Sequence, residues 1–387
     1  MSSAENATRT PSNRRGPVVP ANSLVPANSD PRSALRGKLL DWYVTDRRDL
    51  PWRETRDPYA VWLSETMLQQ TRVETVVPYY QRFMRELPTL AALAEAPEER
   101  VLALWSGLGY YRRARMLHAA AKEVMRAHGG LLPTEAAELQ RLEGVGAYTA
   151  GAIASIAFAR REAVVDGNVA RVLARLHAIE GDIRSSRVVA RLWTLARDLL
   201  PGGDADPGDW NQALMELGAT VCLPRLPRCD VCPVHDQCAA RARGIERELP
   251  RSVPRKRPIA VRRLAIVLAS PRSVLMARRR ADVLFGGLWE PPTSSSDGAD
   301  ALTARLGLRA HDLEHAGNVV HVLSHRRMTV EVRRGRLERQ AHFEAPAPEY
   351  DAIERIDWSR IEHLARAALT RKILQVAKVA PRGLRLT

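Results

Sequence analysis

The sequence predicts a multidomain protein in which an all-α domain precedes an α+β domain. Its 387 residues are typical of two domains. Apolar residues recur every three or four positions through residues 33–218, as in helices that bury one face. Beyond residue 260 the pattern changes to short β-prone runs separated by turn residues.

The N-terminal part of the chain carries the start signals of several helices. Helices are predicted at residues 59–71, 98–104 and 135–142, each beginning at a proline or a capping residue. We expect this helical domain to cover residues 33–240. The segment before it, residues 1–32, is rich in Ser, Asn, Pro and Ala and is predicted to be a disordered tail.

The C-terminal part follows a basic stretch. Residues 241–259 carry many arginines among prolines and are expected to form an exposed linker. The α+β domain is expected at residues 260–379, with a short tail at 380–387. Its predicted elements are the strands 264–270, 274–277, 319–323 and 328–332 and the helices 299–306 and 361–376.

The composition is basic. Lysine and arginine number 59 against 44 acidic residues, which gives a net charge of +15. A polyanion such as nucleic acid is the natural partner of such a chain. Hydrophobic residues make up 45% of the sequence, yet no apolar run approaches the ~20 residues of a membrane span. We therefore expect a soluble intracellular protein without a membrane partner.

All four cysteines lie in one short segment with the spacing C-x6-C-x2-C-x5-C, at Cys222, Cys229, Cys232 and Cys238. A disulfide framework would instead connect distant parts of a small secreted fold. Four neighbouring thiolates can hold one metal centre, either zinc or an iron–sulfur cluster. Simple zinc sites usually contain two short C-x2-4-C pairs, and this segment has only one, so the spacing favours a cluster.

The segment LEGVGAYTA, residues 142–150, lies between two predicted helices. Two glycines around one apolar residue permit a tight turn with positive φ, and the next helix begins at once. Backbone N–H groups at such a helix start can bind a phosphate. Gly144, Val145 and Gly146 are therefore candidate contacts to a DNA backbone, although a simple helix hairpin explains the same residues.

Asp166 in VVDGNVARV precedes a predicted helix with an apolar face. Asp166 or Asn168 can serve simply as the N-cap of this helix. Alternatively, a helix N-terminus favours the ionised form of a carboxyl group. Such an anion could stabilise a cation that forms nearby in a transition state.

Glu65 is the one carboxylate in the apolar segment WLSETMLQQT. Val61, Trp62 and Leu68 lie three or four positions from it, the spacing at which helix side chains meet. A carboxyl group in apolar surroundings has a raised pKa and can act as a general acid. The spacing is equally compatible with a Glu65 that faces solvent.

Together these segments resemble the helix–hairpin–helix DNA glycosylase superfamily with an iron–sulfur loop, and within it the adenine DNA glycosylase (MutY) family. The resemblance covers about residues 39–374. It implies an all-α helix–hairpin–helix glycosylase domain with a [4Fe–4S] cluster in the loop 222–238, followed by an α+β Nudix-like domain. The family motifs appear as PWRETRDPYAVWLSETMLQQTRV, WSGLGYYRRARMLHAAA, LEGVGAYTAGAI, VVDGNVARVL, WNQALMELGATVC, LFGGLWEPP and VLSHRRM.

The resemblance implies a base-excision-repair enzyme of the bacterial cytoplasm, monomeric and associated with the nucleoid. Its substrate would be double-stranded DNA with adenine mispaired with 8-oxoguanine or guanine, and it would hydrolyse the N-glycosidic bond of the adenine. Glu65 matches the general acid, Asp166 the carboxylate that stabilises the oxocarbenium-like sugar, and Asn168 its supporting neighbour. The residues that match the adenine pocket are Trp52, Arg53, Leu68 and Glu216. Gln70 and Tyr110 match the wedges that fill the gap left by the extruded base.

Tyr148 bears on the type of glycosylase. In endonuclease III, a bifunctional relative, the matching position holds a lysine that attacks the sugar, and a phenol cannot form a Schiff base. The resemblance therefore favours a monofunctional enzyme. The alternatives are an endonuclease III-like glycosylase/lyase and a non-catalytic damage-binding protein.

Glu143 replaces the proline usual in the hairpin and adds a negative charge near the expected phosphate.

The second domain resembles the Nudix fold without its catalytic residues. Residues 300–306 lack the glutamates of the R-E-x-x-E-E helix, so pyrophosphate hydrolysis is not expected. Leu323, Ser324 and His325 align with the loop that reads 8-oxoguanine, where Phe-Ser-His is the commoner form. An ordinary hairpin turn remains an alternative for these residues.

Overall fold

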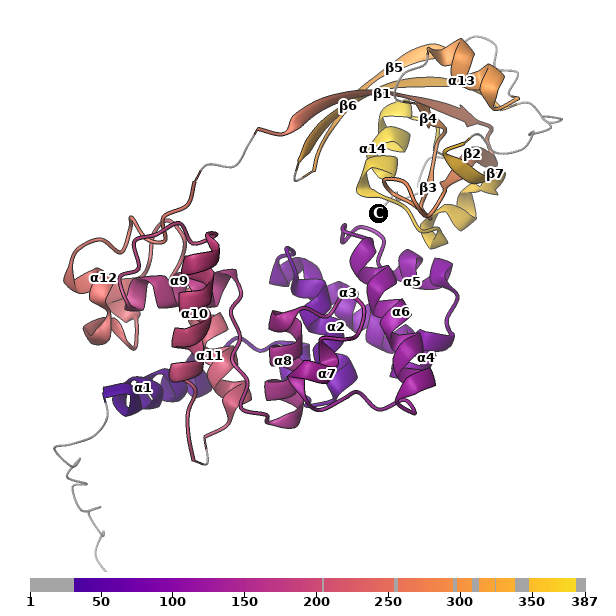
Figure 1. Cartoon of the computed structure of the whole chain (residues 1–387). Helices are drawn as coiled ribbons and strands as arrows, with labels where there is room; N and C mark the ends of the chain where they lie inside the picture. Colours follow the sequence, from indigo (N-terminus) through magenta and orange to yellow (C-terminus); the bar gives the residue numbers. More distant parts are fainter. Residues whose placement is uncertain are drawn as a thin grey trace, which may run out of the picture.

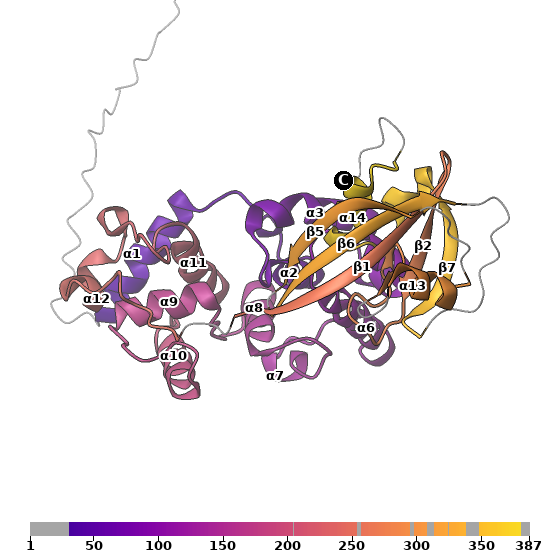
Figure 2. The same cartoon turned by 90° about the horizontal axis from the view of Figure 1, so that it is seen from above.

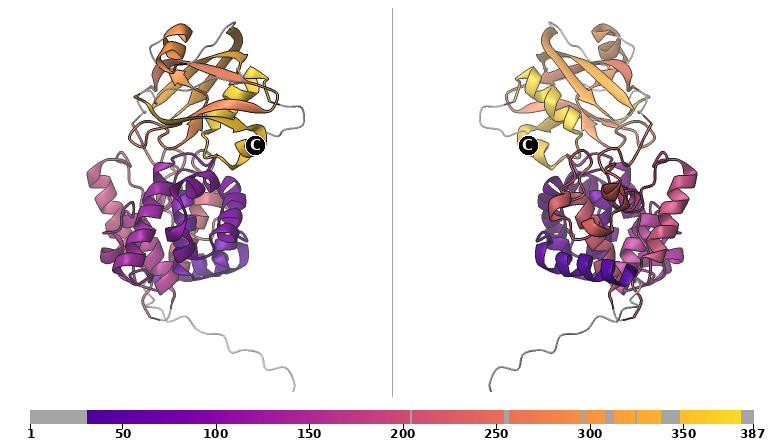
Figure 3. Two further views of the ribbon diagram at one scale, coloured as in Figure 1. Left: turned by 90° about the vertical axis from the view of Figure 1, so that its right-hand side faces the viewer. Right: turned by 90° about the vertical axis from the view of Figure 1, so that its left-hand side faces the viewer.

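The computed structural model contains a helical part and a part built on a β-sheet (Figure 1). Figure 3 shows the β-sheet part stacked on one side of the helical part. The predicted tails lie almost wholly outside the described residues, and the predicted linker does so in part. The structure describes residues 31–203, 205–253, 257–294, 298–307, 313–323, 325–337 and 348–380.

The helices form two groups (Figure 1). A cavity lies between these groups. One group contains α2 to α8, and the other contains α1 and α9 to α12. The bounds are α1 (Pro31–Asp46), α2 (Pro58–Leu68), α3 (Val73–Glu86), α4 (Leu90–Glu95), α5 (Glu98–Leu104), α6 (Arg112–Ala127), α7 (Ala136–Leu139), α8 (Ala147–Phe158), α9 (Gly167–Leu176), α10 (Ser186–Asp198), α11 (Pro207–Thr220) and α12 (Ala239–Ala242).

Local signals explain how the helix that carries Glu65 begins and ends. The carboxylate of Asp57 accepts hydrogen bonds from the backbone N–H groups of Tyr59 and Ala60, and Pro58 occupies the first helical position. α2 ends at Leu68, earlier than predicted, because Gln70 has a left-handed φ of +59° that no α-helix continues. α5 has the predicted bounds, and α7 covers only the middle of its predicted range.

Within the described residues, the second part is built on a seven-stranded mixed sheet with the order β3-β2-β1-β6-β5, in which β4 pairs with β1 and β7 with β2. β1 and β6 run parallel, and the other pairs are antiparallel. The strands are β1 (Ile259–Ala269), β2 (Ser273–Arg279), β3 (Trp289–Glu290), β4 (Thr293–Ser294), β5 (Glu314–Val322), β6 (Arg326–Arg336) and β7 (Tyr350–Asp357).

Successive side chains of β1 point to opposite faces of the sheet and pack in two different hydrophobic clusters, as the two-residue period of a strand requires. Leu264 and Ile266 pack in one cluster with α13 (Ala299–Arg305), whereas Ala265 and Val267 belong to the large core that includes α14 (Ala368–Ala377). Figure 1 shows these helices on opposite faces of the sheet.

The predicted helix 361–376 is wrong in its first part. Residues 358–363 form a 3-10 helix, and an extended segment precedes α14. Tertiary contacts hold this segment. The carbonyl of Ala365 accepts a hydrogen bond from the backbone N–H of Trp289. The carbonyl of Arg366 accepts hydrogen bonds from the side chains of Ser106 and Tyr111 in the helical part. Three of the strands were not predicted from the sequence, namely β3, β4 and β7.

The two parts touch along α5, α6 and the loop between them. The hydroxyls of Ser106 and Tyr111 donate to the carbonyl of Arg366 at 2.7 and 2.6 Å. The indole N–H of Trp289 donates to Glu99 at 3.0 Å. Figure 2, seen from above, shows the β-sheet part over the helix group that contains α2, α3 and α6 and away from α9 to α12. Among the described helices, none has the length and apolar character needed to cross a bilayer.

Candidate active site

A cavity of about 660 Å³ opens between the two helix groups and is bordered by α2, α8, α9 and α11. It brings together most of the sequence-predicted site residues, although they are far apart in the chain. Val145 of the hairpin is buried beside the cavity and does not line it. The predicted residues that line it are Trp52, Arg53, Glu65, Leu68, Gln70, Gly144, Gly146, Tyr148, Asp166, Asn168 and Glu216.

Glu65 faces the protein interior and not the solvent. It is 4% exposed, among the buried side chains of α2. Burial raises the pKa of its carboxyl group to about 7, an effect that the nearby Asp166 reinforces and the Tyr148 hydrogen bond opposes. A carboxyl group with this pKa carries a proton over part of the neutral range and can donate it.

Tyr148 contacts the candidate acid directly, a contact that sequence reasoning missed. Its hydroxyl donates to Oε2 of Glu65 at 2.5 Å and lies 3.2 Å from the sulfur of Met215. Burial and the neighbouring carboxylates raise the pKa of Tyr148 well above its ordinary value, so the group stays a neutral phenol. Tyr148 lies in the first turn of α8, after a hairpin in which Gly144 has a φ of +80°.

Asp166 caps α9 and also faces the cavity. Its carboxylate accepts from the N–H of Val169 at 2.7 Å and from the side-chain amide of Asn168 at 3.0 Å. The expectation of a carboxyl group stabilised in its ionised form holds only in part. Burial raises the pKa of Asp166, and these hydrogen bonds oppose the shift without cancelling it.

Arg171 extends this arrangement to the cysteine segment. Its guanidinium donates to the side-chain oxygen of Asn168 at 2.9 Å and to the carbonyls of Gly218 and Cys222 at 2.6 and 2.8 Å. Hydrogen bonds thus run from the backbone of Cys222 through Arg171 and Asn168 to Asp166. Gly218 permits this close approach, because a Cβ there would lie 2.6 Å from that of Asn168.

Glu216 is held by two arginines, of which Arg48 was missed by sequence reasoning. Arg48 donates through its side chain at 2.7 and 2.8 Å and through its backbone N–H at 3.1 Å, and Arg53 donates at 2.8 Å. Burial would raise the pKa of Glu216, but these hydrogen bonds outweigh it and lower the pKa to about 2. Because both oxygens already accept two hydrogen bonds, any further donor would have to displace one of these groups to bind Glu216.

The candidate wedges Gln70 and Tyr110 share an unusual backbone conformation, with φ values of +59° and +50°. Arg113, a further residue missed by sequence reasoning, connects the two segments that carry them. Its guanidinium donates to the carbonyls of Thr66 and Met67 at the end of α2, and more weakly to that of Gly109 at 3.3 Å. It also lies 5.5 Å from the ring centre of Tyr110.

A second cavity, of about 680 Å³, lies at the boundary between the helical part and the β-sheet part. Tyr110 and His325 line it, and Gln70 borders both cavities. Burial, with help from the positive charge of Lys372, lowers the pKa of His321 in its wall. Ser324, the predicted polar reader of 8-oxoguanine, lies outside the described residues.

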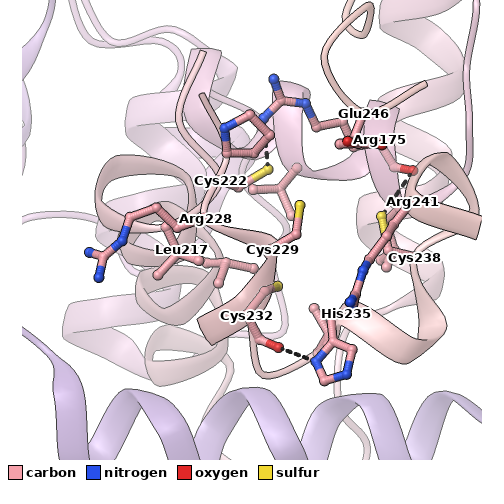
Figure 4. A pocket seen from close by; sticks show the side chains of 15 residues that line it. Arg175, Leu217, Cys222, Arg228, Cys229, Cys232, His235, Cys238, Arg241 and Glu246 are labelled. Atoms are coloured by element: carbon pink, nitrogen blue, oxygen red, sulfur yellow. Dashed lines mark hydrogen bonds between the residues drawn. The ribbon is translucent and has the colours of Figure 1, made fainter. Parts of the chain in front are cut away.

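The four cysteines surround a third, small cavity (Figure 4). All four are free thiols, and Arg175 donates to the sulfur of Cys222 at 3.2 Å. In the described part of the chain, no three His, Cys, Asp or Glu side chains lie close enough to share one ion.

This donor set fits an iron–sulfur cluster. Burial raises the pKa of Cys232 to about 11 and also raises that of Cys229 and Cys238, and a bound cation would favour the thiolate forms that ligate a metal. The guanidinium of Arg175 adds a hydrogen bond of the kind that cluster sulfurs accept.

Comparisons with known proteins identify both parts of the chain. Residues 63–198 match the model of the HhH-GPD superfamily of base excision DNA repair proteins, and residues 263–376 match the NUDIX domain model. A solved structure of a thermostable thymine-DNA glycosylase is 32% identical, with a TM-score of 0.50, and covers 55% of this chain and 97% of its own.

Two curated relatives are similar over both parts. The adenine DNA glycosylase of Homo sapiens is 41% identical over 364 residues, which cover 78% of this chain and 66% of that protein. The adenine DNA glycosylase of Rattus norvegicus is 38% identical over 413 residues, covering 91% of this chain and 79% of the relative.

Proposed function

Because this chain belongs to the adenine DNA glycosylase (MutY) family of the HhH-GPD superfamily, we propose that it removes adenine mispaired with 8-oxoguanine or guanine from double-stranded DNA. One observation carries the proposal: Glu65 and Asp166 line a single cavity, and burial raises the pKa of Glu65 to about 7. The chain spans 66% of the human relative.

In the proposed reaction the target adenine leaves the base stack and enters the cavity. Tyr148 donates to Oε2 of Glu65, which leaves Oε1 to carry the acidic proton in the proposed reaction. Transfer of this proton to a ring nitrogen of adenine makes the base a leaving group. Asp166 then stabilises the cationic sugar, or bonds to it transiently, until water completes the hydrolysis.

The same residues support a monofunctional reaction. Tyr148 carries no amine that could form a Schiff base with the sugar, and its hydroxyl is engaged with Glu65. We therefore expect the full chain to excise adenine from an 8-oxoguanine:adenine duplex and to leave the strand intact until alkali is added. Gel analysis with and without alkali measures this, with a thymine:adenine duplex as the control.

Two results of that assay would contradict the proposal. Strand cleavage without alkali would identify a glycosylase/lyase. A protein that binds the mismatch but releases no adenine would be a damage-binding protein.

The pH dependence of excision should follow the protonation of Glu65. With a pKa of about 7, the general acid is protonated below that pH and loses its proton above it. The single-turnover rate constant is therefore expected to fall about tenfold per pH unit above pH ~7.

Tyr148→Phe provides the matched variant for this profile. The Tyr148 hydrogen bond lowers the pKa of Glu65, so its removal should move the fall in rate to higher pH. A rate that rises with pH through 7 in the native protein would exclude Glu65 as the acid.

We further propose that Cys222, Cys229, Cys232 and Cys238 hold a [4Fe–4S] cluster. When bound, the cluster supplies a cross-link that fixes the loop 222–238 and the carbonyl of Cys222, to which Arg171 donates. We expect purified protein to absorb in the visible range and to contain about four irons per chain. Cys232→Ser should lower the iron content and the Tm, whereas one zinc and no iron would contradict the assignment.

The recognition of 8-oxoguanine is proposed for the second domain, through Ser324 and His325. Its support is the position of His325 in the cavity between the two parts. Gly144, Val145 and Gly146 are proposed to bind the DNA backbone, because Gly146 caps the N-terminus of the twelve-residue helix α8.

A further inference from the structure

The second cavity has an aromatic wall, and the proposed function assigns no role to its residue Phe285. The helical part contributes Gln70 and Tyr110, and the β-sheet part contributes Phe285, His321 and Leu323. The rings of Phe285 and His321 lie next to one another, with centres 6.4 Å apart and an interplanar angle of 56°.

Phe285 has a backbone conformation that bulky residues rarely adopt. Its φ is +63°, in the left-handed region where a side chain is disfavoured. The following glycine is closely packed, because a Cβ on Gly286 would lie 2.5 Å from the carbonyl oxygen of Ala281. Unfavourable backbone of this kind persists where the surrounding structure holds it, and it is frequent at functional sites.

The helical part holds the loop that carries Phe285. The guanidinium of Arg115 donates to the carbonyl oxygens of Ala281 and Gly286, on both sides of Phe285. Arg115 lies in the first turns of α6, a few residues after Tyr110. The same short segment therefore positions the candidate wedge and the Phe285 loop.

The tryptophan and tyrosine side chains in the described part of the second domain face its core. Trp289, Tyr350 and Trp358 are all at most 4% exposed. Phe285 is only half-buried and lines the cavity. Leu323, on the same wall, offers an aliphatic surface. Among the Phe, Tyr and Trp side chains in the described part of this domain, Phe285 is therefore the one available for stacking on a base, beside the imidazoles of His321 and His325 in the same cavity.

We propose that Phe285 is a substrate-binding residue whose ring packs against the purine opposite the excised adenine. This inference rests on the proposed adenine glycosylase function. Stacking between a base and an aromatic ring tolerates any base, because each has a π-face. A phenyl ring also has no hydrogen-bonding group that could distinguish 8-oxoguanine from guanine. Phe285 therefore contributes affinity for both purines and does not select between them.

The test is Phe285→Leu in the full chain. Affinity is measured for duplexes that carry non-cleavable 2′-fluoro-2′-deoxyadenosine opposite 8-oxoguanine or guanine. We expect about tenfold weaker binding to both duplexes, within the range of stacking energies found by substitution. Phe285→Tyr, which keeps the ring, should bind almost as the native protein does. Unchanged affinity of Phe285→Leu would overturn the inference.

A second variant separates binding from loop packing. Phe285→Leu combined with Leu323→Phe returns a phenyl ring to the same wall and should recover most of the lost affinity. Failure to recover, with a lowered Tm, would assign the loss to the loop and overturn the inference. Phe158→Leu, at the end of α8 and outside this cavity, is the matched control. Native protein that excises no adenine would instead contradict the proposed function.

Discussion

Glu65→Gln is expected to lower the single-turnover rate of adenine excision by about 10²–10⁴-fold, the usual contribution of a general acid. Glutamine has nearly the same shape and can still accept the hydrogen bond from Tyr148, but it has no proton to transfer. The pKa of Glu65 is raised because its buried carboxyl group binds a proton more tightly in the folded state. The measurement is the rate constant with excess enzyme on an 8-oxoguanine:adenine duplex.

Stability provides the control for this substitution. The raised pKa means that Glu65 stabilises the fold most at low pH, and that this contribution is lost as the pH rises from the unfolded-state value through about 7. At pH 8 the neutral glutamine should therefore leave the Tm unchanged or raise it. DNA affinity should stay close to that of the native protein. Near-native excision by Glu65→Gln would remove Glu65 from the mechanism.

Asp166→Asn is expected to lower the excision rate by about 10²–10³-fold, the cost of losing one preorganised electrostatic contact to a transition state. Asparagine caps helices about as well as aspartate, and its side-chain oxygen can still accept from the N–H of Val169. The substitution thus removes the negative charge that would stabilise the cationic sugar and preserves the cap.

Asp206→Asn is the matched control, because Asp206 caps α11 by the same kind of hydrogen bonds, to Gly208 and Asp209. If Asp166 were only a cap, the two variants would behave alike and both would retain activity. A large loss in Asp166→Asn alone distinguishes the catalytic hypothesis from the capping hypothesis, which the sequence left open. Single-turnover rates of both variants on the same duplex decide between them.

The predicted fold class and family are both confirmed by the comparisons. Helix starts were predictable where a local signal defines them, as at Pro58 and Glu98. Local signals failed at the segment before α14, where long-range contacts to Trp289, Ser106 and Tyr111 hold an extended backbone. No propensity within residues 361–376 could predict those partners.

The sequence by itself determined the order of the two parts, the cysteine set and the identities of the carboxylates that line the cavity. These depend on residue type and local spacing, which are present in the chain before it folds. The tertiary structure alone decided that Glu65 is buried, that Tyr148 donates to it and that Arg48 holds Glu216. Helical spacing shows which side chains share a face, but burial and pKa depend on which other helices cover that face.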